Sequence, residues 1–344
     1  MPSTENPRPA TRKAKDAATR LIRRAIDTGV GQRALRSIRT DPTPAQLDEW
    51  LRPLFDEDLT RIEKELEGAG PEGYKAFRDL DDDLWSLLLT KEFDAYPGIR
   101  AFLPGHPDPA LQQVWNGTSG VSLAEQSVCF YRKLKEMNSR YGAVPLPDTR
   151  ILDFGCGWGR LTRMLAKDVD PGNLHGCDPV EDILAVCRDS RVPAELAKSD
   201  FLPEELPFDT KFDLIFSFSV FTHISEAAHL ASLKAIHDSL APGGLFVVTV
   251  RPPSYLDFNP LMRPAVERLG HDREAVLSEP SYIFQPHETS GHPQYDEKGG
   301  EMEYGETVIT LPYVREKWSE MFELLDTSVM LGDMYQVALT LRRK

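Results

Sequence analysis

The stretch Ile151-Leu-Asp-Phe-Gly-Cys-Gly-Trp-Gly159 decides the fold. It begins with an apolar run typical of a buried strand, and three glycines then stand at every second position. Because glycine adopts positive φ and lets a ligand approach the backbone, the pattern predicts a tight turn from a strand into a helix. Asp153 precedes the first glycine by two residues. A carboxylate there suits a ligand with an ammonium group and a positive sulfur, and would repel a pyrophosphate.

A dinucleotide site is the alternative interpretation of this turn. That site has the spacing G-x-G-x-x-G, whereas the third glycine here comes one residue early. The run Pro242-Gly243-Gly244 is also unexplained by a dinucleotide fold.

Short apolar runs alternate with helical patterns through the following residues. The runs are 150–154, 173–177, 194–198, 212–217 and 245–250, and the helical patterns are 158–168, 180–189 and 225–239. This alternation predicts a parallel sheet covered by helices on both faces. Residues 322–342 predict two further strands joined at Gly332-Asp333, after a helix at 312–321. The fold class expected is therefore α/β.

Acidic residues end successive strands. Asp178 closes the second run and Asp200 follows the third. Open α/β folds bind ligands at the carboxyl edge of the sheet, where these side chains and Asp153 are expected to meet. Asp178 is placed to hold two ribose hydroxyls, and Asp200 to accept from an adenine amino group while Phe201 or Leu202 packs on the ring. The alternative is that Asp178 and Asp200 cap helices.

In their order, these motifs resemble class I S-adenosylmethionine-dependent methyltransferases over residues 120–344. They are ILDFGCGWGR at 151–160, LHGCDP at 174–179, SDF at 199–201, FDLIFSFSVFTHI at 212–224 and LAPGGLFVVTV at 240–250. The resemblance implies a Rossmann-like seven-stranded, mostly parallel sheet with an antiparallel last strand. It also implies S-adenosyl-L-methionine as cofactor and S-adenosyl-L-homocysteine as product. The cofactor-binding residues it implies are Asp153, Gly155, Cys156, Gly157, Asp178, Pro179, Asp200, Phe201, Ser217 and Phe218.

The function expected is methyl transfer from sulfonium to an oxygen of a small-molecule acceptor. SVFTHI and the ending YGETVITLPYVREKW with Tyr335-Gln336 resemble a bacterial subgroup that acts on sugars, lipids or secondary metabolites. His223 is the candidate general base, because a near-neutral imidazole can take the proton of a hydroxyl. Its alternative role is to fix the loop before Ser225, the expected N-cap of the next helix. Methylation of nitrogen or of a protein side chain, and a non-catalytic cofactor-binding module, remain alternatives.

Two regions flank or interrupt this domain. Residues 1–119 predict a helical N-terminal extension with a disordered start at 1–10 and helices at 11–38, 45–67 and 74–89. Residues 251–304 predict an insertion that serves as a substrate lid, where Tyr295 and His292 are candidate acceptor-binding residues; solvated loop polarity is the alternative. The spacing of His287 and His292 does not place both on one helix face, so no metal site is predicted.

Charge and composition limit the partners. The net charge of −14 is uneven: residues 1–40 carry about +7 and residues 41–100 about −9. An acidic chain gains little from nucleic acid, and no apolar run approaches the ~20 residues of a membrane span. Four irregularly spaced cysteines predict reduced thiols and a cytoplasmic location. The basic N-terminal helix is interpreted as a solvated face, as a contact to the acidic segment or to a second subunit in a homodimer, or as a membrane-surface contact.

Overall fold

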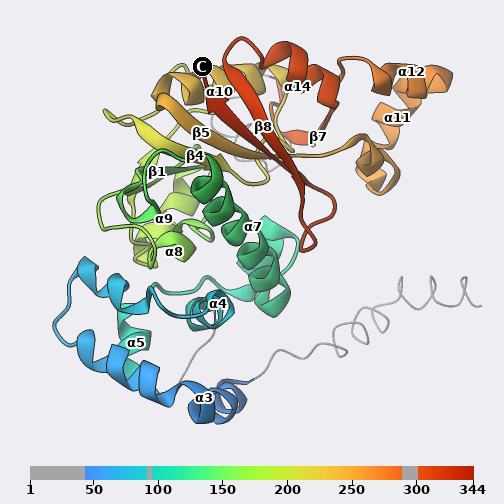
Figure 1. Ribbon diagram of the computed structural model, residues 1–344. Coiled ribbons are helices and arrows are strands. Elements are labelled where there is room, and N and C mark those ends of the chain that lie inside the picture. The colour runs from blue at the N-terminus through green and yellow to red at the C-terminus, as the bar shows by residue number, and fades with distance from the viewer. Residues whose placement is uncertain (1–42, 91–94, 289–300) are drawn as a thin grey trace, which may run out of the picture.

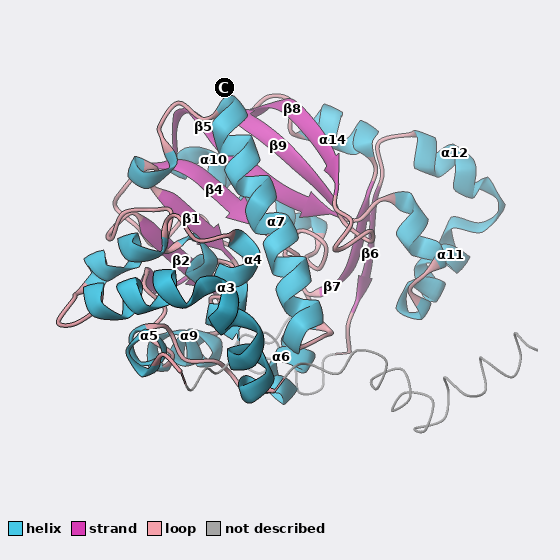
Figure 2. Ribbon diagram, turned by 60° about the horizontal axis from the view of Figure 1, so that its bottom comes forward, coloured by secondary structure: helices cyan, strands magenta, loops and turns pink. Residues whose placement is uncertain are grey.

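The computed structural model describes residues 43–90, 95–288 and 301–344. At its centre is a seven-stranded sheet of order β3-β2-β1-β4-β5-β9-β8 (Figures 1 and 2). Its strands are β1 Ile151–Phe154, β2 Leu174–Asp178, β3 Glu195–Lys198, β4 Phe212–Ser217, β5 Leu240–Val250, β8 Phe322–Val329 and β9 Val337–Arg343. Strand β9 is antiparallel to both of its neighbours, whereas β1 to β5 pair in parallel. The predicted α/β sheet with an antiparallel last strand is confirmed.

Alternate residues of the central strands feed two apolar cores. In β4, Leu214 and Phe216 belong to one core and Ile215 to the other. The first core is covered by α7 (Gly120–Tyr141), which crosses the sheet in Figure 2. The second is covered by α10 (Glu226–Ser239) and α14 (Leu311–Lys317). Burial of both faces explains why the strands are continuously apolar in the sequence.

The helix expected after the glycine turn is much shorter than the predicted span of 158–168. Only α8, Thr162–Leu165, is helical there, whereas α9, Glu181–Asp189, matches its expected range. Gly159 has a φ of +74°, which is outside the helical region. The buried Arg163 guanidinium also donates to the carbonyl oxygens of Trp158 and Gly159 at 3.0 Å each. The glycine turn therefore extends to residue 161, and residues 158–161, which the apolar pattern assigned to the helix, belong to the turn.

The N-terminal region is helical, as expected, but one predicted helix is divided. Its elements are α3 Pro44–Glu65, the 3-10 helix η1 Pro71–Phe77, α4 Asp82–Thr90, α5 Pro97–Phe102 and α6 Pro109–Asn116. A single helix at 74–89 was expected. Instead, the Asp81 carboxylate accepts from the backbone N–H groups of Asp83 and Leu84, so a new helix begins after it. The expected basic helix at 11–38 lies outside the described residues.

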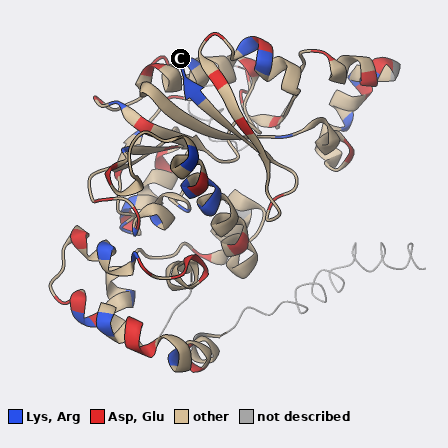
Figure 3. Ribbon diagram, in the orientation of Figure 1, with Lys and Arg blue, Asp and Glu red and all other residues tan. Residues whose placement is uncertain are grey.

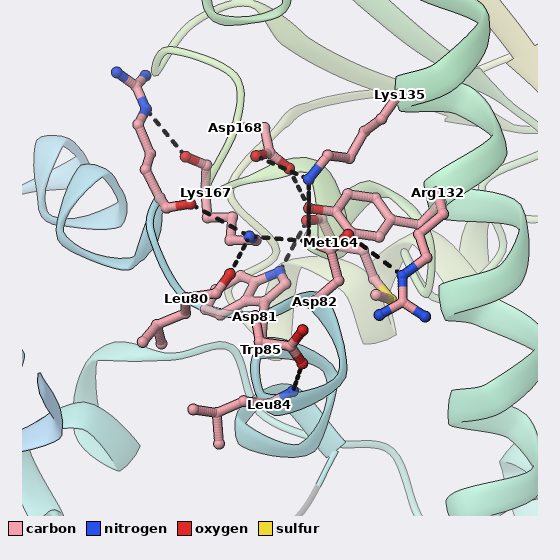
Figure 4. A network of polar contacts seen from close by, with 12 residues as sticks. Leu80, Asp81, Asp82, Leu84, Trp85, Arg132, Lys135, Met164, Lys167 and Asp168 are labelled. Atoms are coloured by element: carbon pink, nitrogen blue, oxygen red, sulfur yellow. Dashed lines mark hydrogen bonds and ion pairs between the residues drawn. The ribbon is translucent and has the colours of Figure 1, made fainter. Parts of the chain in front are cut away.

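Buried polar contacts join α4 to the sheet domain (Figure 4). Lys167 is 1% exposed; its ammonium group lies 3.0 Å from Asp82 and donates to the Leu80 carbonyl at 2.8 Å. The indole of Trp85 donates to the Met164 carbonyl at 2.9 Å. These contacts connect segments about 80 residues apart, so α4 packs as part of the same folded unit.

The insertion contains more regular structure than the sequence indicated. It comprises η3 Pro253–Asp257, η4 Pro260–Met262, α11 Arg263–Leu269, η5 Gly270–Asp272, α12 Arg273–Ser278 and β6 Tyr282–Pro286. Strand β6 pairs with β7, Gly305–Ile309, in a second, antiparallel sheet that was not predicted. A small apolar core that includes Met262, Ile283 and Val308 joins this sheet to α11. The helices α11 and α12 project from one end of the molecule (Figure 1).

Opposite charges are interspersed on the N-terminal helices (Figure 3). Arg61 pairs with Glu65 at 2.9 Å, and Lys75 pairs with Glu72 at 2.7 Å. Part of the acidic charge of residues 41–100 is thus neutralised within the region itself. Among the described helices, none is both long and apolar enough to cross a membrane. All four cysteines are free thiols.

Candidate active site

A cavity of about 910 Å³ opens at the carboxyl edge of the sheet. Its wall combines the turn after β1, the end of β2, and the loops that follow β3 and β4. The insertion, the β8–β9 hairpin, the end of α6 and one residue of α7 also line it. This volume is near the upper end of the ~300–1,000 Å³ usual for ligand sites. The edge at which the acidic residues were expected to meet is therefore hollow.

The glycine turn forms one side of this cavity. Gly155 and Gly157 have φ values of +76° and +52°. The N–H groups of Gly155 and Cys156 donate to the Cys177 carbonyl at 2.8 and 3.0 Å, which fixes the turn against β2. A Cβ on Gly155 would collide with Val220, whereas one on Gly157 would meet no described atom within 4 Å. The backbone at Gly157 is therefore open to a ligand.

Asp178 lies beside this open backbone and lines the cavity. One carboxylate oxygen accepts from the Gly157 N–H and the other from the Val180 N–H, both at 3.0 Å. Burial raises the pKa of Asp178 to about 6, although these two hydrogen bonds oppose the rise. The N-cap of α9 is Val180, so Asp178 bonds the backbone ahead of the helix without capping it, and it also lines the cavity. The neighbouring Pro179 lines the cavity as well.

Asp153 is buried beneath the turn. Its carboxylate accepts from the Thr162 hydroxyl at 2.6 Å, and burial raises its pKa to about 7. Asp200 is exposed and Phe201 half-buried, and both line the cavity after β3.

The end of β4 places its two candidate residues differently. Phe218 lines the cavity. The hydroxyl of the fully buried Ser217 donates to the Phe154 carbonyl at 3.0 Å, so this side chain connects β4 to β1.

His223 lines the same cavity with both ring nitrogens engaged. Its Nε2 lies 2.9 Å from Nη2 of Arg251, and its Nδ1 lies 2.8 Å from the Gly305 carbonyl. Because a guanidinium only donates, Nε2 accepts and Nδ1 carries the proton. Burial and the Arg251 charge lower the pKa of His223 to about 4. Its role as general base stays a prediction, and it would require the bond to Arg251 to break.

Arg251 is the centre of a compact cluster at this end of the cavity. Its Nη1 donates to the buried Glu306 and, at 3.0 Å, to the Thr222 carbonyl. The Tyr255 ring lies 4.1 Å from the guanidinium carbon, and His287 lies 3.2 Å from Glu306. Burial raises the pKa of Glu306, but the hydrogen bond with His287 and the charge of Arg251 outweigh it and lower the pKa to about 2.

The cluster contains a possible set of metal ligands. Ligand atoms of His223, His287 and Glu306 lie within 4.8 Å of one another. The Arg251 guanidinium contacts both Glu306 and His223. Its positive charge therefore occupies the place that a metal ion bound by these ligands would take.

The sequence analysis missed Arg251, Glu306 and Gln336 as candidate residues. Arg251 directly follows the apolar run 245–250, so the rule that selected the acidic residues at strand ends would have found it. Gln336 reaches the cavity from the β8–β9 hairpin, whereas Glu306, on β7, contacts the cavity-lining Arg251. Both lie in stretches that carried the subgroup resemblance, but neither was assigned a role. His292 and Tyr295 lie outside the described residues.

The strand order, with antiparallel β9 between β5 and β8, and the glycine turn beside Asp178 are the arrangement that the resemblance to class I S-adenosylmethionine-dependent methyltransferases implied. Residues 151–244 match the family described as a methyltransferase domain. That match covers β1 to the first half of β5, which is the part of the chain that forms the glycine turn and the Asp178 site.

Curated relatives are similar over part of their length. A trans-aconitate 2-methyltransferase of Variovorax paradoxus is 29% identical over 124 residues, which are 34% of this chain and 47% of that protein. A ubiquinone biosynthesis O-methyltransferase of Ruegeria pomeroyi is 29% identical over 170 residues, 45% of this chain and 64% of that protein. This chain thus spans about half of the first relative's length and somewhat under two thirds of the second's.

A solved structure, that of an S-adenosylmethionine-dependent methyltransferase from Clostridium acetobutylicum, aligns with a TM-score of 0.44 at 16% identity. The alignment covers 68% of this chain and 96% of that one.

The residues present fit S-adenosylmethionine. The open backbone at Gly157 leaves room for the ligand, and the Asp178 carboxylate retains lone pairs for ribose hydroxyls. The carboxyl groups of Asp153, Asp178 and Asp200 around the cavity favour a ligand with positive charge. Phe201 offers an aromatic surface at the same edge.

Proposed function

We propose that the protein transfers a methyl group from S-adenosylmethionine to an oxygen of a small-molecule acceptor: a sugar, a lipid-linked compound or a secondary metabolite. The observation that supports this most is that one cavity contains both the glycine turn with Asp178 and the polar cluster around Arg251. The names of the curated relatives above, a trans-aconitate and a ubiquinone biosynthesis methyltransferase, support a small-molecule acceptor.

The chain's own residues position the reactants. Gly155, Gly157 and Asp178 hold the cofactor at one side, with Phe218 beside it, and the Arg251 end receives the acceptor. When bound, the cofactor supplies a methyl group activated by a positive sulfur. Holding the acceptor atom in line with that methyl group accounts for much of the rate enhancement in such reactions. His223 is the residue we propose for the proton of a hydroxyl acceptor, once its Nε2 is released from Arg251.

The same proposal assigns the regions of the chain. Residues 1–119 form the helical extension, residues 120–344 the methyltransferase domain, and residues 251–304 its substrate lid. The contact of His223 with the Gly305 carbonyl, directly after this insertion, supports a coupling between lid and site. A cytoplasmic location, a homodimer and the subgroup suggested by SVFTHI remain predictions.

Methylation of nitrogen is the second candidate. The observation that favours it is that both nitrogens of His223 are already bonded, because an amine acceptor needs no strong base. The NMR chemical shift of the transferred methyl group distinguishes O-methyl from N-methyl transfer, because both products gain the same mass. A non-catalytic cofactor-binding module would instead bind the cofactor tightly and methylate nothing in a cell extract.

Calorimetric titration with S-adenosylhomocysteine tests the cofactor site first. The wild-type protein is expected to bind, and Asp178→Ala to weaken binding by about 10- to 100-fold, because bonds to a charged group are lost. Asp238→Ala on α10 is the matched control, since its carboxylate pairs with the exposed Lys234. Absence of binding by the wild-type protein would refute the proposal. Labelled methyl transfer to sugars, lipids and metabolites then tests the activity.

A further inference from the structure

Two residues that line the cavity each have a buried polar atom without a partner. Arg251 is 7% and Gln336 5% exposed, and both line the cavity. Within the part of the chain that the structure describes, Nε of Arg251 and Oε1 of Gln336 have no hydrogen-bond partner. Buried polar groups in native proteins are almost always bonded, so two such atoms at one cavity indicate a ligand.

The rest of each side chain is held firmly in place. Arg251 is fixed by Glu306, Thr222 and His223. The Gln336 amide nitrogen donates to Asp333 at 2.8 Å and to the Ser219 hydroxyl at 3.2 Å. These contacts fix the amide orientation, so its oxygen is the atom left for a ligand.

The backbone around this pair is itself constrained. Ser219 has a φ of +63°, one of only two positive values among the non-glycine residues described. Its N–H donates to the Thr249 hydroxyl at 2.7 Å. Strained backbone that is held by its surroundings concentrates at functional sites. Ser219 thus anchors Gln336 on a segment whose geometry is fixed before any ligand binds.

The two open atoms are of opposite kinds. Arg251 Nε donates and Gln336 Oε1 accepts, and a hydroxyl group can serve both. The charge of Arg251 is balanced by Glu306, and Asp333 places a second carboxyl group beside Gln336. An anionic ligand would therefore lie near two carboxyl groups, and a cationic one near the guanidinium. An uncharged hydroxyl group avoids both penalties.

An aromatic surface continues from this pair to the solvent. Tyr335 lines the cavity and is 52% exposed; its ring packs edge-on against Phe258, which is 62% exposed. The Tyr255 ring centroid lies 6.2 Å from that of Tyr335, and the same Tyr255 ring lies over Arg251. Exposed aromatic rings that border a polar pocket mark a binding surface for the apolar face of a ligand.

We propose that Arg251 and Gln336 bind the methyl acceptor through a hydroxyl group, and that the acceptor is an uncharged, polyhydroxylated molecule whose carbon face lies on Tyr335. This assignment rests on the proposed function and names its substrate class. Arg251 and Gln336 are specificity-determining residues: they orient the acceptor, and the reacting atom need not be the hydroxyl that they hold.

Labelled methyl transfer to two matched panels tests the substrate class. One panel contains neutral hexoses and inositols, and the other the corresponding uronic acids. The proposal expects label in the neutral panel. Label in the uronic acids only, or in neither panel while S-adenosylhomocysteine still binds, overturns it. Failure of the wild-type protein to bind S-adenosylhomocysteine overturns the proposed function instead.

Variants of the pair test its role separately. Gln336→Leu and Arg251→Lys are expected to raise the KM of the labelled acceptor by about tenfold or more, the loss for a bond to a charged or buried partner. The KM of S-adenosylmethionine should change by less than about threefold, because the cofactor contacts remain. Arg273→Lys is the control, because Arg273 pairs with Asp257 on the surface of the insertion. Equal effects on both KM values, with unchanged thermal melting, would overturn the assignment.

Discussion

Nη2 of Arg251 lies 2.9 Å from Nε2 of His223, and this contact determines which ring nitrogen carries the proton. The proton stays on Nδ1, which faces the Gly305 carbonyl at 2.8 Å. Together with burial, the Arg251 charge lowers the pKa of His223 to about 4. In the folded protein the His223 ring is therefore neutral throughout the physiological pH range.

The contribution of His223 to stability is expected to be lost as the pH falls through the range from about 6.5 to 4. In this window the unfolded chain binds a proton at His223 and the folded protein does not, so the free energy of unfolding rises with pH. For His223 the difference between pH 7 and pH 5 is about 2 kcal/mol. In urea unfolding, the free energy of unfolding at pH 7 minus that at pH 5 should be lower for His223→Gln than for the wild type by about 2 kcal/mol. The control variant His237→Gln, on α10, should show the same difference in unfolding free energy between pH 7 and pH 5 as the wild type. The same difference in all three proteins would contradict the prediction.

Cofactor binding is expected to strengthen as the pH rises through about 6. Burial raises the pKa of Asp178 to about 6, and only the carboxylate can accept from two ribose hydroxyls. Titration of S-adenosylhomocysteine at pH 6 in buffers of different ionisation enthalpy should therefore show proton release. The release should disappear in Asp178→Asn. Burial also raises the pKa of Asp153 to about 7. Proton release by Asp153→Asn therefore measures how much of the wild-type release comes from Asp153.

The two glycines of the turn are expected to respond differently to alanine. A Cβ on Gly155 collides with Val220, so Gly155→Ala should lower the free energy of unfolding by more than about 2 kcal/mol. Gly157→Ala adds only the strain of positive φ, about 1 kcal/mol, but its methyl group projects toward the ligand. It should weaken S-adenosylhomocysteine binding more than it lowers stability. If Gly155→Ala and Gly157→Ala show the same ratio of lost S-adenosylhomocysteine binding to lost stability, Gly157 does not face the ligand.

Removal of Arg251 is expected to create a metal site. Arg251→Ala leaves His223, His287 and Glu306 with ligand atoms within 4.8 Å of one another and removes the neighbouring positive charge. Two imidazoles and a carboxylate are a ligand set that Zn²⁺ accepts. Calorimetry should detect Zn²⁺ binding to this variant. The double variant Arg251→Ala, His287→Ala should bind much more weakly; identical binding by both would place the ion elsewhere.

The contact of Lys167 with Asp82 is expected to stabilise the whole molecule. Lys167→Met leaves the buried Leu80 carbonyl without its donor and removes one cation from Asp82, which keeps Lys135 at 3.0 Å, so it should lower the free energy of unfolding by about 1–3 kcal/mol. Lys234→Met removes an exposed partner of Asp238 on α10 and should have little effect. Chemical unfolding followed by far-UV circular dichroism compares the two. Separate transitions for the N-terminal helices and the sheet domain would contradict the single folded unit.

The sequence determined the sheet and the cofactor side of the cavity. Each strand and its following turn are encoded locally, by a continuous apolar run, a glycine turn and an acidic residue at the strand end. The positions of Asp153, Asp178 and Asp200 along the chain were therefore enough to predict that they share one edge of the sheet. Local capping was harder to anticipate, since the Asp81 side chain alone divides the helix expected at 74–89.

Only the tertiary structure decided the acceptor side. Arg251, Glu306 and Gln336 come from three separate elements, and what they do depends on which atoms their neighbours leave unbonded. His223 illustrates the difference: the sequence identified it as a candidate base, but its bond to Arg251 and its low pKa arise from a residue 28 positions away. Spacing along the chain encodes a turn, whereas burial and long-range hydrogen bonds set the chemistry of a side chain.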